Sequence, residues 1–74
     1  MVVEVKLFAK FRQGRFSKSQ VEFPKGSSLG DLLEVLQIPA KEVGILLVNG
    51  RWASSESILT SHDVVSVFPS LGGG

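Results

Sequence analysis

The segment SLGDLLEVL, residues 28–36, decides how this 74-residue chain folds. Its leucines recur at the i, i+3, i+4 and i+7 spacing that places apolar side chains along one side of a helix: Leu29, Leu32, Leu33 and Leu36. Ser28 is a suitable N-cap, and Asp31 stands where a capping box usually has Glu or Gln. We therefore predict a helix that starts after Ser28, ends at Pro39 and turns its leucines into the core.

The residues before this helix predict two strands. Apolar and charged residues alternate in the first of them, which has its apolar side chains on one face: Val3, Val5 and Leu7. The basic stretch 9–17, with Gly14 as its turn-former, should be the loop of a hairpin. It leads to a second strand over residues 18–23, with Val21 and Phe23 facing inward.

Three more strands are predicted after the helix. They cover an apolar run that fits a buried strand, a short return strand and the end of the domain: residues 45–48, 51–54 and 64–68. Asn49-Gly50 indicates a type I′ hairpin, because both residues tolerate the positive φ that this turn demands. Ile58 and Leu59, in the loop that follows, are expected to close the underside of the core.

The order of elements indicates an α+β fold with a mixed sheet of four to five strands and one main helix across one face. One further helical turn, residues 41–43, is expected to stop at Gly44. With the first and last strands adjacent at the centre, this arrangement is the β-grasp, or ubiquitin-like, fold. We assign residues 1–69 to the domain and residues 70–74 to a flexible glycine tail.

The composition narrows the classes of function. Absence of cysteine excludes disulfides, thiolate metal sites and a cysteine nucleophile. Eight basic and seven acidic residues leave a net charge of +1, too balanced to indicate binding to nucleic acid or an anionic membrane. No apolar run approaches the roughly 18 residues of a membrane span, and the start is no signal peptide. We expect a cytoplasmic protein.

Three features admit both a structural and a functional interpretation. His62 is expected to be a solvated turn residue rather than a proton-transfer or metal residue, and no metal site is predicted. Trp52 either packs on the edge of the core, which we prefer, or anchors a partner. The third feature is a cluster of basic residues that could be solvated or could bind an acidic partner: Lys10, Arg12, Arg15, Lys18 and Lys25.

The end of the chain is the candidate for the chemistry. Residues 72–74 are all glycine, and without Cβ atoms such a tail can lie extended in a channel too narrow for other residues. The carboxylate of Gly74 is unhindered, and joining it to a leaving group such as AMP would open its carbonyl to attack. A frayed terminus is the alternative explanation for these glycines.

The segment VVSVFPSLGGG, residues 64–74, resembles the C-terminus of the molybdopterin synthase small subunit. That family ends its last strand with phenylalanine and proline, followed by an apolar residue and Gly-Gly. The opening VKLFAKFR, residues 5–12, and VNG, residues 48–50, are also similar to that family. Sulfur carriers of the thiamine pathway share the fold and the Gly-Gly end, usually without the Phe-Pro pair. Ser70 and Gly72 depart from the usual pattern, which weakens the choice of pathway rather than the carrier role.

In both families an ATP-dependent, ubiquitin-activating-like enzyme adenylates the terminal glycine, and a sulfur donor then converts it to a thiocarboxylate. The resemblance implies that Gly74 carries the sulfur and that Gly73 keeps the tail slim. The chain would be a carrier and not an enzyme, with no bound cofactor, because its activating partner uses the ATP. Its second partner would be the large subunit of molybdopterin synthase or another sulfur acceptor.

Partner binding is predicted for the last strand and the base of the tail: Val64, Phe68, Pro69, Leu71 and Gly72. If Val65 and Val67 face the helix, alternation puts Val64 and Phe68 on the opposite face as an apolar patch. A neighbouring loop could instead cover them. Two other functions stay open: sulfur carriage for the thiamine or another pathway, and a ubiquitin-like modifier or interaction module that carries no sulfur.

Overall fold

The structure, a computed structural model of the chain, describes residues 1–70. Its strands (β), α-helix (α) and 3-10 helices (η) follow in the order β1 (Val2–Leu7), η1 (Ala9–Arg12), β2 (Lys18–Glu22), α1 (Leu29–Val35), η2 (Ala40–Glu42), β3 (Val43–Val48), β4 (Arg51–Trp52) and β5 (Val64–Pro69). The predicted tail, apart from Ser70, lies outside the described residues.

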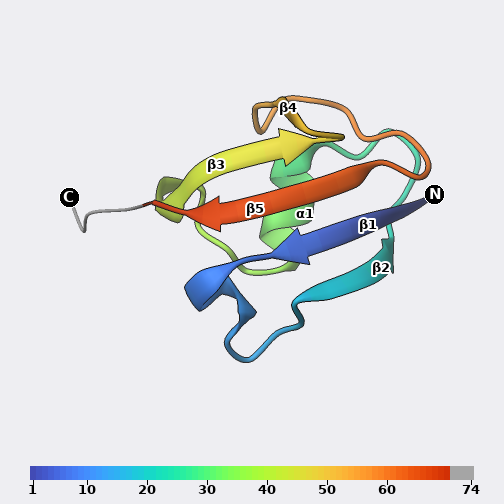
Figure 1. Cartoon of the computed structure of the whole chain (residues 1–74). Coiled ribbons are helices and arrows are strands. Elements are labelled where there is room, and N and C mark those ends of the chain that lie inside the picture. Colours follow the sequence, from blue (N-terminus) through green and yellow to red (C-terminus); the bar gives the residue numbers. More distant parts are fainter. Residues whose placement is uncertain (71–74) are drawn as a thin grey trace.

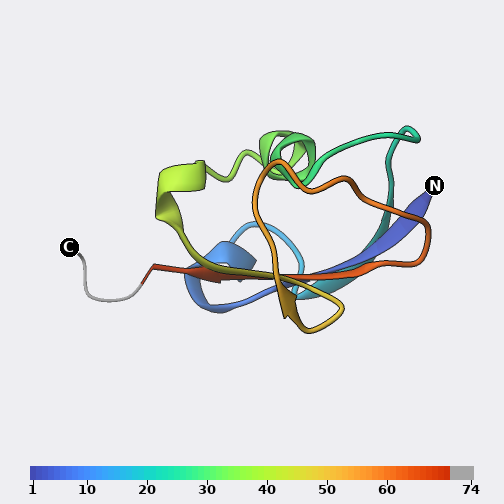
Figure 2. The same cartoon turned by 90° about the horizontal axis from the view of Figure 1, so that it is seen from above.

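Within the described residues, five strands form one mixed sheet in the order β2-β1-β5-β3-β4. The first and last strands run parallel at the centre of the sheet, and the remaining pairs are antiparallel. Helix α1 crosses one face, and Figures 1 and 2 show α1 and η2 on the same side of the sheet. The predicted β-grasp fold is confirmed.

The centre of the core lies between the two parallel strands and α1. Four valines of β1 and β5 are fully buried because alternation turns every second side chain of both strands toward the helix: Val3, Val5, Val65 and Val67. The predicted leucine stripe meets them, with Leu29, Leu32 and Leu33 at most 3% exposed. The hairpin loop adds a core residue that the sequence did not single out, Phe11 in η1.

Two predicted boundary signals are confirmed. The capping box of α1 is complete: the Ser28 hydroxyl accepts from Asp31 N at 3.1 Å, and Asp31 Oδ2 accepts from Ser28 N at 2.9 Å. Asn49 and Gly50 have φ angles of 54° and 81°, as a type I′ turn requires. The return strand after this turn is shorter than predicted, because β4 ends at Trp52.

The predicted end of the helix at Pro39 is wrong. Helix α1 ends at Val35, and the chain then turns at Gln37, whose φ of 59° lies in the left-handed region. The Arg15 guanidinium satisfies carbonyls that this ending leaves without a helical partner. It donates to Leu36 O at 3.0 Å and to Gln37 O at 3.2 Å.

Three further expectations, two in β3 and one in the loop before β5, are corrected. The run 45–48 is not buried throughout: Leu46 is 7% exposed and the other three are half-buried, because β3 has the helix on one face only. Gly44 does not stop the preceding turn but lies within β3. In the loop before β5, Leu59 is buried as expected, whereas Ile58 is 60% exposed.

Asp63 is a buried carboxylate that ties two turns together. Its Oδ1 accepts from Asn49 Nδ2 at 2.9 Å and from Thr60 Oγ1 at 3.0 Å, and its Oδ2 accepts from Thr60 N at 2.8 Å. Burial alone would raise the pKa of this carboxyl, but these hydrogen bonds favour the charged form and hold the pKa below its usual value. Asn49 also accepts from Val64 N, so the network joins the β3–β4 turn to β5.

The substitution Asp63→Asn is therefore expected to lower the free energy of unfolding by about 2 kcal/mol at neutral pH. Both carboxylate oxygens accept hydrogen bonds, and an amide would present a donor where one of them stands. The native advantage exists above the pKa of unfolded aspartate, about 3.9, and is lost as the pH falls through the lower folded pKa. Urea unfolding of both proteins from neutral pH to about pH 3 measures this.

Glu56→Gln, which removes an exposed carboxylate, is the control and should change the stability little at any pH. An Asp63→Asn deficit that stays constant with pH would contradict the lowered pKa.

Candidate functional site

Neither α1 nor any other helix within residues 1–70 has the length and apolar character that crossing a bilayer needs. In the same residues, no three His, Asp or Glu side chains come together as a metal site would require. His62 is exposed in the turn before β5, as predicted for a solvated turn residue.

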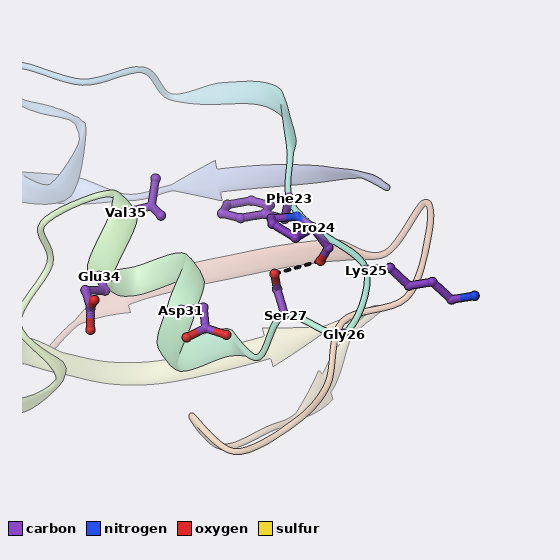
Figure 3. A pocket seen from close by; sticks show the side chains of 8 residues that line it. All are labelled: Phe23, Pro24, Lys25, Gly26, Ser27, Asp31, Glu34 and Val35. Atoms are coloured by element: carbon purple, nitrogen blue, oxygen red, sulfur yellow. Dashed lines mark hydrogen bonds between the residues drawn. The ribbon is translucent and has the colours of Figure 1, made fainter.

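A surface hollow of about 440 Å³ lies between residues 23–27 and α1 (Figure 3). The Ser27 hydroxyl beside it donates to Pro24 O at 2.7 Å, and Asp31 accepts the capping hydrogen bond from Ser28. These two polar side chains hold the loop and the start of the helix. The chemistry is better sought on the other face of the sheet.

That face carries an apolar patch. Because Val67 is buried against the helix side, its neighbour Phe68 points away from α1. The register places Ile45 beside Phe68, and Trp52 beside Leu47. Five apolar side chains make up what we call the open-face patch: Phe8, Ile45, Leu47, Trp52 and Phe68.

Two aromatic groups dominate the open-face patch. The rings of Phe8 and Phe68 stack with their centroids 4.1 Å apart and their planes 9° from parallel. Trp52 is 75% exposed, so the expectation that it packs on the edge of the core is wrong. An exposed tryptophan and half-buried phenylalanines within one apolar patch are typical of surfaces that bind another protein.

The predicted partner-binding residues lie at different places. Val64 shares the face of Phe68, as alternation predicted, but sits four residues earlier on β5, roughly 13 Å away along the strand. Its neighbour across the sheet is Glu4, and together with His62 they border a separate hollow of about 170 Å³. Pro69 ends β5 opposite Val43.

The other predicted site residues, Leu71, Gly72, Gly73 and Gly74, lie outside the described residues. Sequence reasoning did not find Phe8, Ile45 and Leu47 in the open-face patch. Phe8 could have been found, because it continues the outward positions of β1. The two β3 residues could not, because their face depends on the register against β5.

The base of the tail is held against the start of β3. Ser70 N donates to Glu42 O at 2.8 Å, one residue beyond the end of β5. Ser70 is only two residues from Phe68, so the chain leaves the domain at the border of the open-face patch. Figure 1 shows the end of β5 beside the beginning of β3.

The basic cluster is partly occupied by partners within the chain. Arg15 caps the end of α1, and Lys10 forms an ion pair with Glu42 at 3.4 Å. Both members of this pair are well exposed, so the pair contributes little to stability. It does place charges of both signs next to the base of the tail.

Comparison with known proteins adds the following. The model of the ThiS family matches residues 5–74. Among curated proteins, none matches the sequence significantly. One similar structure is a protein of Pyrococcus furiosus proposed to be subunit 1 of molybdopterin converting factor, 32% identical, with a TM-score of 0.79; the match covers 96% of this chain and 99% of that one.

Two less similar structures share the fold. SAMP1 of Haloferax volcanii is 23% identical with a TM-score of 0.77, and the match covers 100% of both chains. A complex of subunits 1 and 2 of molybdopterin-converting factor from Helicobacter pylori matches at 22% identity with a TM-score of 0.64, again covering 100% of both chains.

Proposed function

This chain belongs to the ThiS family of ubiquitin-like sulfur carriers, and we propose that its carboxylate at Gly74 is adenylated and converted to a thiocarboxylate for molybdopterin biosynthesis. In this proposal the domain performs no catalysis and binds no cofactor. It presents a terminal acyl group to a ubiquitin-activating-like enzyme, which uses ATP, and later to a sulfur acceptor.

The chemistry needs no side chain of the domain. A carboxylate oxygen of Gly74 attacks the α-phosphorus of ATP, and pyrophosphate leaves with the electrons of the broken P–O bond. Hydrosulfide, the sulfur donor in the simplest case, then attacks the carbonyl carbon. AMP departs as the C–O bond breaks, a proton is lost to solvent, and a thiocarboxylate remains.

The observation that carries the proposal is the position of the open-face patch beside the base of the tail. A partner that binds Phe68 and its apolar neighbours stands within reach of a tail that starts two residues later. Binding on the patch can therefore supply affinity while the glycines deliver the carboxylate. The anchor and the reacting group are separate, so binding energy from the patch can be used to orient the carboxylate at the reacting centre.

The relatives guide the choice of pathway and partners. The Pyrococcus furiosus relative and the Phe68-Pro69 pair favour the molybdopterin pathway. The Helicobacter pylori complex leads us to propose the large subunit of molybdopterin synthase as the acceptor-side partner. Sulfur carriage for the thiamine pathway is the second candidate, because the ThiS family model matches nearly the whole chain.

The test is intact mass spectrometry after incubation with ATP, a matching adenylating enzyme and a sulfide source. We expect a gain equal to one oxygen replaced by sulfur, confined to the C-terminal peptide, and no gain when ATP is omitted. The loaded chain is then offered to the two acceptor systems, a molybdopterin synthase large subunit with its precursor and a thiazole-forming enzyme. Failure of every cognate activating enzyme to load the chain would refute the carrier role.

A further inference from the structure

Gly44 lies where β3 passes the end of β5, at a distance that only glycine permits. A Cβ added at Gly44 would stand 2.7 Å from Ser70 Cα and 2.8 Å from Pro69 O. Both contacts are with backbone, which cannot swing aside as a flexible side chain can. The φ angle of Gly44 is not positive, so the backbone conformation does not require glycine here. The lack of space for a Cβ atom does.

The register around Gly44 shows what the close approach achieves. Val43 pairs with Pro69, and Ile45 pairs with Phe68. Gly44 between them has no partner on β5 and forms a β-bulge opposite the end of that strand. The pairing then continues through the hydrogen bond from Ser70 N to Glu42 O. Glycine at position 44 thus allows the backbone pairing to extend as far as Ser70.

We propose that Gly44 is a positioning residue for the C-terminal carboxylate, because it sets where the chain leaves the domain relative to the open-face patch. This inference rests on the proposed function. A partner bound on the patch must find Gly74 in its active site, and the four residues from Leu71 to Gly74 span at most roughly 14 Å. With only four residues between Ser70 and the carboxylate, the tail has little spare length to compensate for a displaced base.

The test compares Gly44→Ala with Gly14→Ala. A Cβ at Gly14 meets nothing within 4 Å, but its φ of 71° is strained for alanine, so this control costs stability in the hairpin loop without touching β3 or β5. Adenylation by the activating enzyme is followed as pyrophosphate release at a temperature where all three proteins are folded. Hydrogen exchange of the Ser70 amide, measured by NMR, reports separately on its hydrogen bond to Glu42 O at the base of the tail.

In Gly44→Ala we expect kcat to fall about tenfold, since an ångström of misplacement can cost a hundredfold. KM should change less than about threefold, because the aromatic part of the open-face patch is retained. Ser70 exchange should accelerate in this variant. Gly14→Ala should keep the native kcat and the native Ser70 exchange.

Equal losses of kcat in both variants would assign the effect to stability and overturn the positioning role. So would an unprotected Ser70 amide in the native chain, a measurement that does not depend on the variant folding. A native chain that releases no pyrophosphate would refute the proposed function and this inference with it, whereas a normal native rate with an unaffected Gly44→Ala would refute only the inference.

Discussion

Deleting Gly73 and Gly74 is expected to abolish sulfur loading while leaving the melting temperature of the domain nearly unchanged. The core is complete without them, since its buried residues run from Val3 to Val67. The deleted residues carry no side chain that could add apolar burial. Sulfur loading is measured by intact mass, and the melting temperature by circular dichroism.

Adding one residue after Gly74 should be as damaging as the deletion. The extension keeps every native residue but moves the carboxylate out of register with the activating site. Both altered chains should still compete with the native chain for the activating enzyme, because the open-face patch is intact. If the extended chain accepts sulfur as well as the native one, the terminal-carboxylate mechanism is wrong.

The fold could be predicted from the sequence because its main elements are specified locally. The leucine spacing after Ser28, the alternation in β1 and the Asn49-Gly50 turn each depend on residues close together in the chain. A single helix packed across one face of a mixed sheet buries the resulting stripes economically. Local signals and the global fold agree here.

What sequence reasoning missed depends on contacts between distant residues. The helix ends at Val35, and Arg15, 21 residues before Leu36, binds the carbonyls of Leu36 and Gln37 that follow it. The Asp63 network depends on Asn49, 14 residues away. The apolar run of β3 has no alternation, so nothing local shows that one of its faces lacks a covering helix.

The sequence predicted which side chains of β5 share a face, but not which residues of other strands lie beside them. Alternation along β5 correctly put Phe68 away from the helix, and the same argument placed Val64 on that face. The neighbours of Phe68 are Phe8, which follows β1, and Ile45 of β3, and Trp52 of β4 lies beyond them beside Leu47. The positions of the β3 and β4 residues follow from cross-strand register. Trp52 is exposed in the edge strand β4, beside Leu47 on the face without a helix, and the position of β4 in the sheet cannot be derived from the segment itself.

Phe68→Ala is expected to weaken binding to the activating enzyme by about 2–4 kcal/mol, which is roughly 30- to 1,000-fold in Kd. An aromatic ring at the centre of an apolar interface usually contributes much of the binding affinity. Phe68 is such a ring, because it stacks on Phe8 within the open-face patch. The cost to folding should be smaller, about 1–2 kcal/mol, because the side chain is only half-buried and its main loss is the stacked pair. Calorimetric titration and thermal melts measure the two quantities.

Val67→Ala is the matched control, since Val67 is the neighbouring residue on β5 but points into the core, where it is fully buried. Its substitution should cost about 2–3 kcal/mol of stability. Its Kd per folded molecule should stay native, because no atom of the open-face patch is removed. The pair of variants thus separates loss of folding stability from loss of the binding surface.

A Phe68→Ala protein that is strongly destabilised yet binds as tightly per folded molecule as the native chain would remove the open-face patch from the mechanism. Partner recognition would then have to lie elsewhere on the domain.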